Sequence, residues 1–252
     1  MLANLGASTS WISRVYEVAP FVNLEGTWDS YLSNYKSSFR KWVKKVERKA
    51  TEHPDCRIDV IDGTSLTSDS IDRLEELERR ARHWSEGTAH FADPRFGKML
   101  KLLALKPDHH IELRMLSSGT KWIAAELMLL DRDRALGLWT AFDSTYDYTG
   151  TYVVADAIRS CFARGLRLFD FLQGDEEYKL KWATGSREIL QVYVARRKVR
   201  ALLPFVSLSI RWRAAKSERI RRWRASVTKF LRRFSNGPDQ AESMKGVDGS
   251  DA

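Results

Sequence analysis

The sequence contains few of the residues that mark disulfide-rich or metal-binding proteins. Among its 252 residues are 2 cysteines, 5 histidines, 6 prolines and 14 glycines. Cys56 and Cys161 lie far apart and show no metal-ligand spacing, so we expect both to be reduced and structural. His90, His109 and His110 have no ligand-like partners in the sequence. We therefore predict no metal site.

Long apolar runs are also missing. The longest, Trp122–Leu130 and Leu202–Ile210, fall well short of the ~20 apolar residues that span a bilayer, and Glu126 interrupts the first. The opening MLANLGASTS has neither the basic region nor the apolar stretch of a secretory signal. These features predict a cytoplasmic protein, with attachment to the inner face of the plasma membrane left open.

What the sequence does contain is an uneven distribution of charge. Residues 1–195 hold 27 basic and 28 acidic side chains, whereas residues 196–233 hold 14 basic side chains and the single acid Glu218. The last 19 residues return to a net charge of −3. A neutral body with a strongly basic appendage predicts an anionic partner for the appendage rather than for the whole protein.

Hydrophobic periodicity gives the expected elements of the body. Apolar residues at helical spacing predict helices over 38–50, over 71–84 and after Pro94. Residues 110–118, 121–131 and 135–143 have the pattern of three strands joined by short turns, which predicts an antiparallel meander. Segment 121–131 is apolar on both faces, so it should lie inside the sheet with a layer on each side.

The remaining body alternates between strands and helices. The expected order is an entering strand or extended segment at 15–24, then, after the meander, a buried helix at 152–164, a strand at 166–172, a short helix at 176–184 and a last strand at 189–197. This order predicts an α+β fold with a parallel crossover through helix 152–164. We expect one domain over residues 10–196.

Four stretches of the body resemble the CelD-type acyltransferases, which are relatives of the Fem-type aminoacyl transferases. FDFLQGDEEYKLKWAT at 169–184 is similar to the FDF, GDE, YK and W signature of that family. The stretches 37–49, 79–96 and 141–158 agree with three further family patterns, in the right order. The resemblance implies a GNAT-like fold, with a mixed, mostly antiparallel sheet flanked by helices. It also implies acyl transfer, usually to an amine, in cell-envelope or exopolysaccharide work.

The chain departs from this family at two points. Family members are commonly tandem, with a second GNAT-like half before the one matched here, and almost none of it is present. The turn Tyr148-Thr149-Gly150 stands where the family often has Ser-Pro-Gly. A non-catalytic binding module in an exopolysaccharide complex is therefore kept as an alternative.

The resemblance implies a donor site at the start of helix 152–164. An acyl-CoA would be anchored by its pyrophosphate at this helix N-terminus, where the first N–H groups are unpaired and electropositive. The predicted binding residues are Thr149, Gly150, Thr151 and Tyr152. The competing interpretation is an ordinary helix-capping turn.

Catalytic candidates flank this turn and follow strand 166–172. Asp143 ends the preceding strand, where a carboxylate either orients or deprotonates the amine or caps the loop. In the family resemblance, Lys179 would stabilise the oxyanion and Tyr178 would protonate the leaving thiolate, with Asp175 beside them. The competing interpretation is that Asp175 caps the short helix and Lys179 is solvated. Glu126, the one charge in an apolar strand, is either a base with a raised pKa or a satisfied core carboxylate.

The basic appendage has an apolar stripe along one helical face. Trp223, Phe230 and Leu231 belong to this stripe, and seven Arg and Lys side chains surround it. The pattern predicts a basic amphipathic helix over 197–234 that lies on an anionic membrane surface. A nucleic-acid arm is the rival interpretation, although phosphate binding needs no apolar face. Residues 235–252 are small, polar and acidic, and we expect them to be disordered.

These observations predict an N-acyltransferase that moves an acyl group from acetyl-CoA or another acyl-CoA to an amine. The expected acceptor is an amino sugar or a lipid-linked envelope precursor, met at the cytoplasmic face of the membrane. The enzymatic alternative is a Fem-type aminoacyl transfer from charged tRNA to a peptidoglycan precursor. Outside that alternative, we expect no nucleic-acid partner.

Overall fold

The structure is a computed structural model that describes residues 9–53, 55–104 and 111–196. By their internal contacts the residues fall into two units, Val15–Leu190 and a second unit made of Met1–Arg14 with Gln191–Ala252. The first unit carries the helices of the described residues and the candidate site. The predicted basic helix at 197–234 and the predicted disordered end at 235–252 lie outside the described residues.

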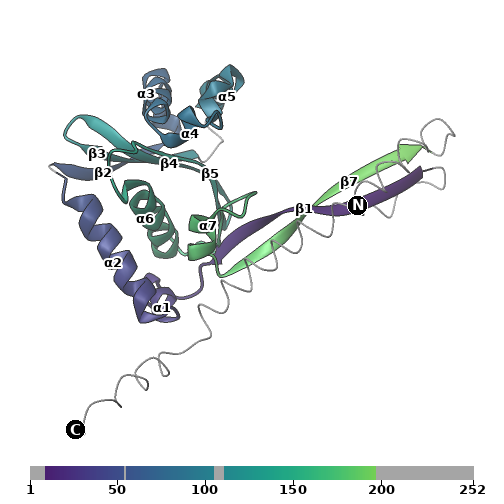
Figure 1. The fold of residues 1–252 in the computed structure, drawn as a ribbon, viewed down its shortest axis with the longest axis horizontal. Coiled ribbons are helices and arrows are strands. Elements are labelled where there is room, and N and C mark those ends of the chain that lie inside the picture. The colour runs from purple at the N-terminus through teal and green to yellow at the C-terminus, as the bar shows by residue number, and fades with distance from the viewer. Residues whose placement is uncertain (1–8, 54, 105–110, 197–252) are drawn as a thin grey trace, which may run out of the picture. The chain divides into compact units, whose positions relative to one another are not determined.

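One mixed sheet organises the fold, with strands in the order β2-β3-β4-β5-β6-β1-β7 (Figure 1). The strands are β1 (Thr9–Asn23), β2 (Cys56–Asp62), β3 (Ile111–Ser118), β4 (Lys121–Asp131), β5 (Arg134–Phe142), β6 (Leu168–Asp170) and β7 (Gly185–Arg196). The helices are α1 (Trp28–Ser33), α2 (Ser37–Thr51), α3 (Ser68–Arg79), α4 (Arg82–Ser85), α5 (Pro94–Ala104), α6 (Thr149–Ala163) and α7 (Glu177–Trp182). Two 3₁₀ turns, η2 (Gly63–Ser65) and η3 (His90–Ala92), complete the described elements.

The predicted meander is confirmed, because β3, β4 and β5 pair antiparallel in sequence and β2 adds to the outer edge of β3. β4 is buried without a break from Trp122 to Met128. This continuous burial confirms the expectation that segment 121–131 lies inside the sheet with a layer on each face.

Helices cover both faces of the meander (Figure 1). On one face α3 and α5 enclose a core that includes Leu74, Leu113 and Leu127. On the other face α6 packs on β4 and α2 packs on α6, with Leu116 and Val153 in the core between them. The apolar stripe of α2 faces inward, and its lysines lie outside, as its helical periodicity predicts.

The crossover from β5 through α6 to β6 gives the parallel pairing that the sequence predicts, but the pairing is short. Only Arg134–Leu136 of β5 pair with Leu168–Asp170 of β6. Beyond this point the N–H of Phe171 donates to Pro20 O at 3.0 Å, and the N–H of Gly174 donates to Val18 O at 3.0 Å. The chain after β6 therefore follows β1 while β5 continues along β4, and the two parallel strands part.

The position of β1 was not predicted by the sequence. Segment 15–24 was expected only as an entering strand or extended segment, whereas β1 lies inside the sheet between β6 and β7. Phe21 pairs with Asp170 of β6, and the Phe21 carbonyl accepts the N–H of Thr184 at 2.9 Å on the other side. These partners lie about 150 residues away in sequence, beyond the reach of local periodicity.

No helix in the described part of the chain combines the length and the apolarity needed to cross a bilayer.

Candidate active site

A cavity of about 580 Å³ lies where β5 and β6 part. Residues 137–140 of β5 and residues 171–173 after β6 form two of its walls. Glu126, Tyr178 and Lys179 line it as well. Its volume is in the range of small-molecule sites.

The cavity is lined from both faces of the sheet. Trp139 and Thr140 are consecutive in β5 and therefore point to opposite faces. Trp139 belongs to the core under α3 and α5. Thr140 donates to Glu126, whose strand partner Arg114 is hydrogen-bonded to Asp156 on α6. The space between β5 and β6 therefore connects the α3 side of the sheet with the α6 side.

Glu126 is the buried carboxyl group of the cavity, with 2% of its surface exposed. The Thr140 hydroxyl donates a hydrogen bond to its Oε2. Burial raises the pKa of Glu126 to about 8, although the hydrogen bond from Thr140 and the charges of Lys179 and Arg114 act in the opposite direction. Near neutral pH this carboxyl group can therefore both hold a proton and accept one.

Gly137 leaves the space that the Glu126 carboxyl group occupies. A Cβ at this position would lie 3.0 Å from Glu126 Oε1 and 3.4 Å from Phe169 Cζ. Such contacts are tighter than those of ordinary side chains, so any larger residue would displace the carboxyl group or the ring.

Tyr178 reaches the cavity from α7, where Thr140 and Glu126 also line the wall. Burial of the hydroxyl group raises the pKa of Tyr178 above the ordinary tyrosine value, and the charges of Glu126 and Glu176 add to the effect. Since 37% of the residue is exposed, the ring extends from the surface to the buried carboxyl group. The phenol therefore stays protonated at neutral pH.

Lys179 fixes the loop that precedes α7. Its Nζ donates to Gln173 O at 2.7 Å and lies 3.0 Å from Glu176 Oε2, and only 8% of the residue is exposed. The loop turns at Gly174, whose φ is 124° and whose Cβ position would lie 2.2 Å from Glu176 Oε2. Lys179 therefore holds a cavity wall in place, and its charge also lowers the pKa of Glu126.

On the α3 side, the wall depends on the buried carboxylate of Glu78, which is 2% exposed. Glu78 Oε1 accepts from Trp139 Nε1 at 2.8 Å and from the N–H of His90 at 3.1 Å, and Oε2 accepts from the N–H of Phe91 at 2.7 Å. Burial alone would raise the pKa of Glu78, but the His90 imidazole, whose Nδ1 lies 3.6 Å from Oε1, and these three hydrogen bonds outweigh burial and lower the pKa. The carboxylate therefore stays charged and joins α3, β5 and the segment before α5.

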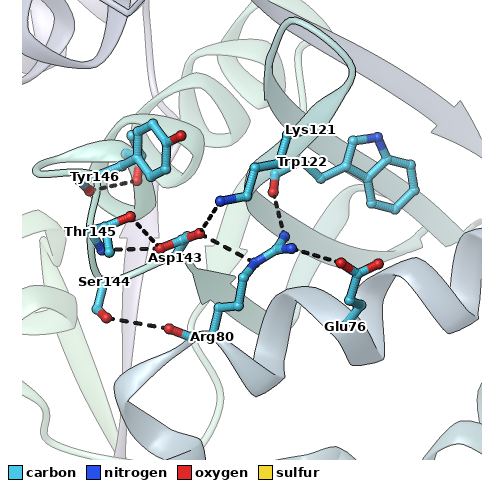
Figure 2. A network of polar contacts seen from close by, with 9 residues as sticks. Glu76, Arg80, Lys121, Trp122, Asp143, Ser144, Thr145 and Tyr146 are labelled. Carbon is cyan, nitrogen blue, oxygen red and sulfur yellow. Dashed lines mark hydrogen bonds and ion pairs between the residues drawn. The ribbon is translucent and has the colours of Figure 1, made fainter.

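Asp143 lies at the end of β5 in a separate polar network (Figure 2). Its carboxylate accepts from Lys121 Nζ at 2.8 Å, lies 3.2 Å from Arg80 Nε, and accepts from the Thr145 N–H at 3.1 Å and the Thr145 hydroxyl at 2.6 Å. Burial would raise the pKa of Asp143, but the hydrogen bonds from Lys121 and Thr145 prevail and lower it. These contacts cap the loop that leads to α6.

The first turn of α6 follows this loop, and its N-cap residue Tyr148 is in the left-handed region with φ 66°. The Tyr148 side chain makes no capping hydrogen bond to the helix N-terminus. Thr149 and Gly150 are buried, and the Thr149 hydroxyl donates to Tyr146 O at 3.0 Å. A Cβ at Gly150 would lie 2.3 Å from Phe142 Cδ1, so this glycine permits close packing of α6 on β5.

The outer side of the same turn is more accessible and bordered by cations. Thr151 and Tyr152 are half-buried, and burial, followed by the charge of Asp156, raises the pKa of Tyr152. Lys45 of α2 lies 5.2 Å from the centre of the Tyr148 ring. The uncapped helix N-terminus and this nearby lysine together make a positive environment.

Comparison with known families identifies the fold. A sequence model of the acetyltransferase (GNAT) domain matches residues 37–180, which is more than half of the chain. The match runs from α2 into α7 and includes every wall of the cavity. The chain belongs to the GNAT acetyltransferase family. GNAT-type domains typically bind an acyl-CoA and an amine acceptor.

No curated protein matches the sequence at a significant level. Solved structures share the GNAT-like fold at low sequence identity. A conserved protein of unknown function from Bacteroides thetaiotaomicron is 14% identical, with a TM-score of 0.53 over 78% of this chain. The crystal structure of FemX is 12% identical, with a TM-score of 0.52 over 76% of this chain. This chain covers 64% of the length of each of these two structures. Identities this low show a common fold alone.

Of the predicted catalytic residues of this GNAT domain, the structure brings Tyr178 and Lys179 together at the cavity, beside Glu126. Asp175 is exposed and is not among the cavity walls, and the N-cap of α7 is Glu176. Asp143 belongs to the separate network at the α6 turn. The catalytic and donor-binding roles assigned to these residues stay predictions.

Sequence reasoning missed Glu78, Gly137 and Thr140. A signal for Glu78 exists, because it follows Ile71 and Leu74 at helical spacing and so places a carboxylate on the apolar face of α3. Thr140 and Gly137 gave no such signal, since their roles depend on where Glu126 points across the neighbouring strand.

In the described part of this GNAT domain, no group of three or more His, Cys, Asp or Glu side chains is arranged to hold a metal ion.

Proposed function

We propose that this GNAT domain transfers an acyl group from an acyl-CoA to a primary amine in the cavity between β5 and β6, with Glu126 as the general base. The carrying observation is the burial of Glu126 in that cavity, with its pKa raised to about 8. An amine reaches the site as an ammonium ion and must lose a proton before it attacks the thioester. A carboxyl group with a pKa near 8 is suited to accept that proton at neutral pH.

Tyr178 is proposed as the acid that protonates the leaving thiolate. Its phenol is protonated at neutral pH, and it lines the same cavity as Glu126. Lys179 is proposed to position the cavity wall, because its ammonium group is held by Gln173 and Glu176. In this proposal the oxyanion is held by backbone N–H groups of β5 beyond Leu136, an edge that β6 leaves at that point.

The donor is proposed to bind with its pyrophosphate at the first turn of α6, over Thr149, Gly150, Thr151 and Tyr152. Support comes from the absence of a side-chain cap on this described helix and from Lys45 beside Tyr148. Gly150→Val is unsuitable as a test, since its Cβ alone would overlap the Phe142 ring. Lys45→Glu, on an exposed position, is the cleaner variant.

The acceptor is proposed to be an amino sugar or a related envelope precursor met at an anionic membrane surface through residues 197–234. A second candidate donor is a charged tRNA. It is favoured by the exposed lysines Lys41, Lys44 and Lys45 along α2, which present positive charge beside the α6 turn.

Transfer is tested by incubating the protein with acetyl-CoA and a panel of amines (glucosamine, lysine and putrescine) while thiol release is followed. We expect amine-dependent thiol release by the wild type. Glu126→Gln should still bind acetyl-CoA in a calorimeter but lose about 10²–10⁴-fold in rate. Acetyl-CoA that gives no heat at millimolar concentration would overturn the CoA proposal and favour the tRNA donor. Full activity of Glu126→Gln would overturn the role of Glu126.

A further inference from the structure

We infer that Glu78 is a positioning residue that sets the acceptor half of the cavity. Glu78 touches neither proposed reacting group. It accepts the indole N–H of Trp139 and the backbone N–H groups of His90 and Phe91, and Trp139 and His90 are cavity walls. The inference rests on the proposed function, because it assigns this half of the cavity to the amine.

The wall on the α3 side has little regular structure of its own to hold it in place. Residues 86–89 form neither helix nor strand, yet Glu86 and Thr88 line the cavity. Glu78 captures the two consecutive N–H groups at the end of this segment, at 3.1 and 2.7 Å. One carboxylate therefore fixes where an irregular segment meets the cavity.

The same carboxylate couples this segment to β5. Trp139 is 3% exposed, and its Nε1 donates to the same Glu78 Oε1 that holds His90, at 2.8 Å. Phe91 packs edge-on against the Trp139 ring, with ring centres 5.8 Å apart. A shift of Glu78 therefore moves the indole and the segment together, because both are held by the same pair of oxygens.

The position and charge of this wall assign it to the acceptor. The proposed donor turn is at α6, on one face of the sheet, whereas Trp139 and the segment 86–90 belong to the α3 side. The two reactants reach the same gap from opposite faces. The α3-side wall also carries the carboxylate of Glu78 behind Trp139 and that of Glu86 at the cavity, an arrangement that favours a cationic amine.

The test compares Glu78→Gln with Glu76→Gln, which removes an equal charge from the exposed side of the same helix. Gln keeps the shape of Glu78 but replaces one accepting oxygen by a donor, so one captured N–H loses its partner. We expect the KM for the amine (glucosamine, or the panel amine that the wild type acetylates) to rise about tenfold. The KM for acetyl-CoA and kcat should change little. Glu76→Gln should leave all three constants unchanged.

A second variant keeps the inference testable if Glu78→Gln does not fold. Trp139→Phe removes one of the three donors, and it should raise the amine KM several-fold with the acetyl-CoA KM unchanged. Hydrogen exchange adds an independent readout, since the amides of His90 and Phe91 should exchange faster in Glu78→Gln.

The outcomes separate this inference from the proposed function. A wild type that acetylates no panel amine overturns the proposed function, and this inference with it. An active wild type whose folded Glu78→Gln keeps the amine KM, or loses kcat alone, overturns only the role of Glu78. An unfolded Glu78→Gln together with an unchanged amine KM in Trp139→Phe overturns it as well.

Discussion

Single residues at the cavity act through burial rather than through unusual chemistry. Glu126 is an ordinary glutamate whose pKa rises to about 8 because β4 places it among buried neighbours. Tyr178 stays protonated for the same reason. The strength of each effect depends on how completely the surrounding residues exclude water.

Glu126 should make both stability and rate depend on pH. Its folded pKa of about 8 lies above the unfolded value of about 4.3. Between these values the folded state holds a proton that the unfolded state has lost, so the free energy of unfolding should fall as pH rises toward 8. The transfer rate should instead rise through the same range as the base is freed.

Denaturant titrations and initial rates at several pH values measure the two trends. Glu126→Gln should lose the pH dependence of stability between about pH 4 and 8. An unchanged stability profile in this variant would contradict the buried, titrating carboxyl group.

Gly137→Ala should disturb Glu126 without touching it chemically. The new Cβ would lie 3.0 Å from Glu126 Oε1, so the carboxyl group or β5 must shift, at a cost of about 1–3 kcal/mol in stability. The midpoint temperature of thermal unfolding and the transfer rate should both fall. Gly97→Ala is the matched control, because its Cβ would lie 3.5 Å from Phe91, an ordinary contact. Equal losses of stability and transfer rate in the two variants would refute the steric argument.

At the scale of elements, the sequence predicts the helices and strands that depend on local residue patterns. The three strand-like runs predicted β3 to β5, and the apolar helix 152–164 predicted the crossover to β6. The position of β1 was missed because its partners lie far away in sequence. The burial of Glu126 was anticipated from its apolar strand, but its partner Thr140 was not, because cross-strand register is not visible in a single strand.

The loop between β5 and α6 shows the same limit. The sequence allowed Asp143 to be either a base or a loop cap. It could not show that two cations lie against the Asp143 carboxylate, Arg80 from the C-cap of α3 and Lys121 from β4 (Figure 2). The lowered pKa and these cations favour the cap, because a carboxylate held by two cations is a weak base.

Asp143→Asn should therefore destabilise the fold by about 2 kcal/mol, since it weakens charged hydrogen bonds to Lys121 and Thr145. The wild-type contribution is present above the unfolded pKa of about 3.9 and is lost as pH falls through the lower folded value. Asp147→Asn, on an exposed position of the same loop, is the control for thermal unfolding. A stable Asp143→Asn protein without activity would favour the catalytic interpretation.

At the scale of the whole molecule, charge separates a neutral body from a basic segment. Residues 1–195 nearly balance, and residues 196–233 carry a net charge of +13. The chain also covers only 64% of the length of the two solved structures with a similar fold.

Residues 197–234 should bind anionic vesicles reversibly. High salt should weaken binding by screening the basic side chains. Part of the binding should persist, because Trp223 and Phe230 insert into the apolar layer. Trp223→Glu should reduce binding at every salt concentration, whereas Arg221→Gln with Arg222→Gln should act mainly at low salt. Co-sedimentation with phosphatidylglycerol vesicles measures this. Unchanged sedimentation of all variants would show that this segment is not the anchor.

The parting of β5 and β6 has a consequence for steady-state kinetics. A gap lined from both faces of the sheet lets two reactants occupy it together, each from its own side, so neither must leave before the other arrives. Double-reciprocal plots at several fixed amine concentrations should then intersect, as for a ternary complex, and not run parallel. A product analogue such as desulfo-CoA should compete with acetyl-CoA but be noncompetitive toward the amine. Parallel lines would instead indicate an acyl-enzyme that forms and breaks in separate half-reactions.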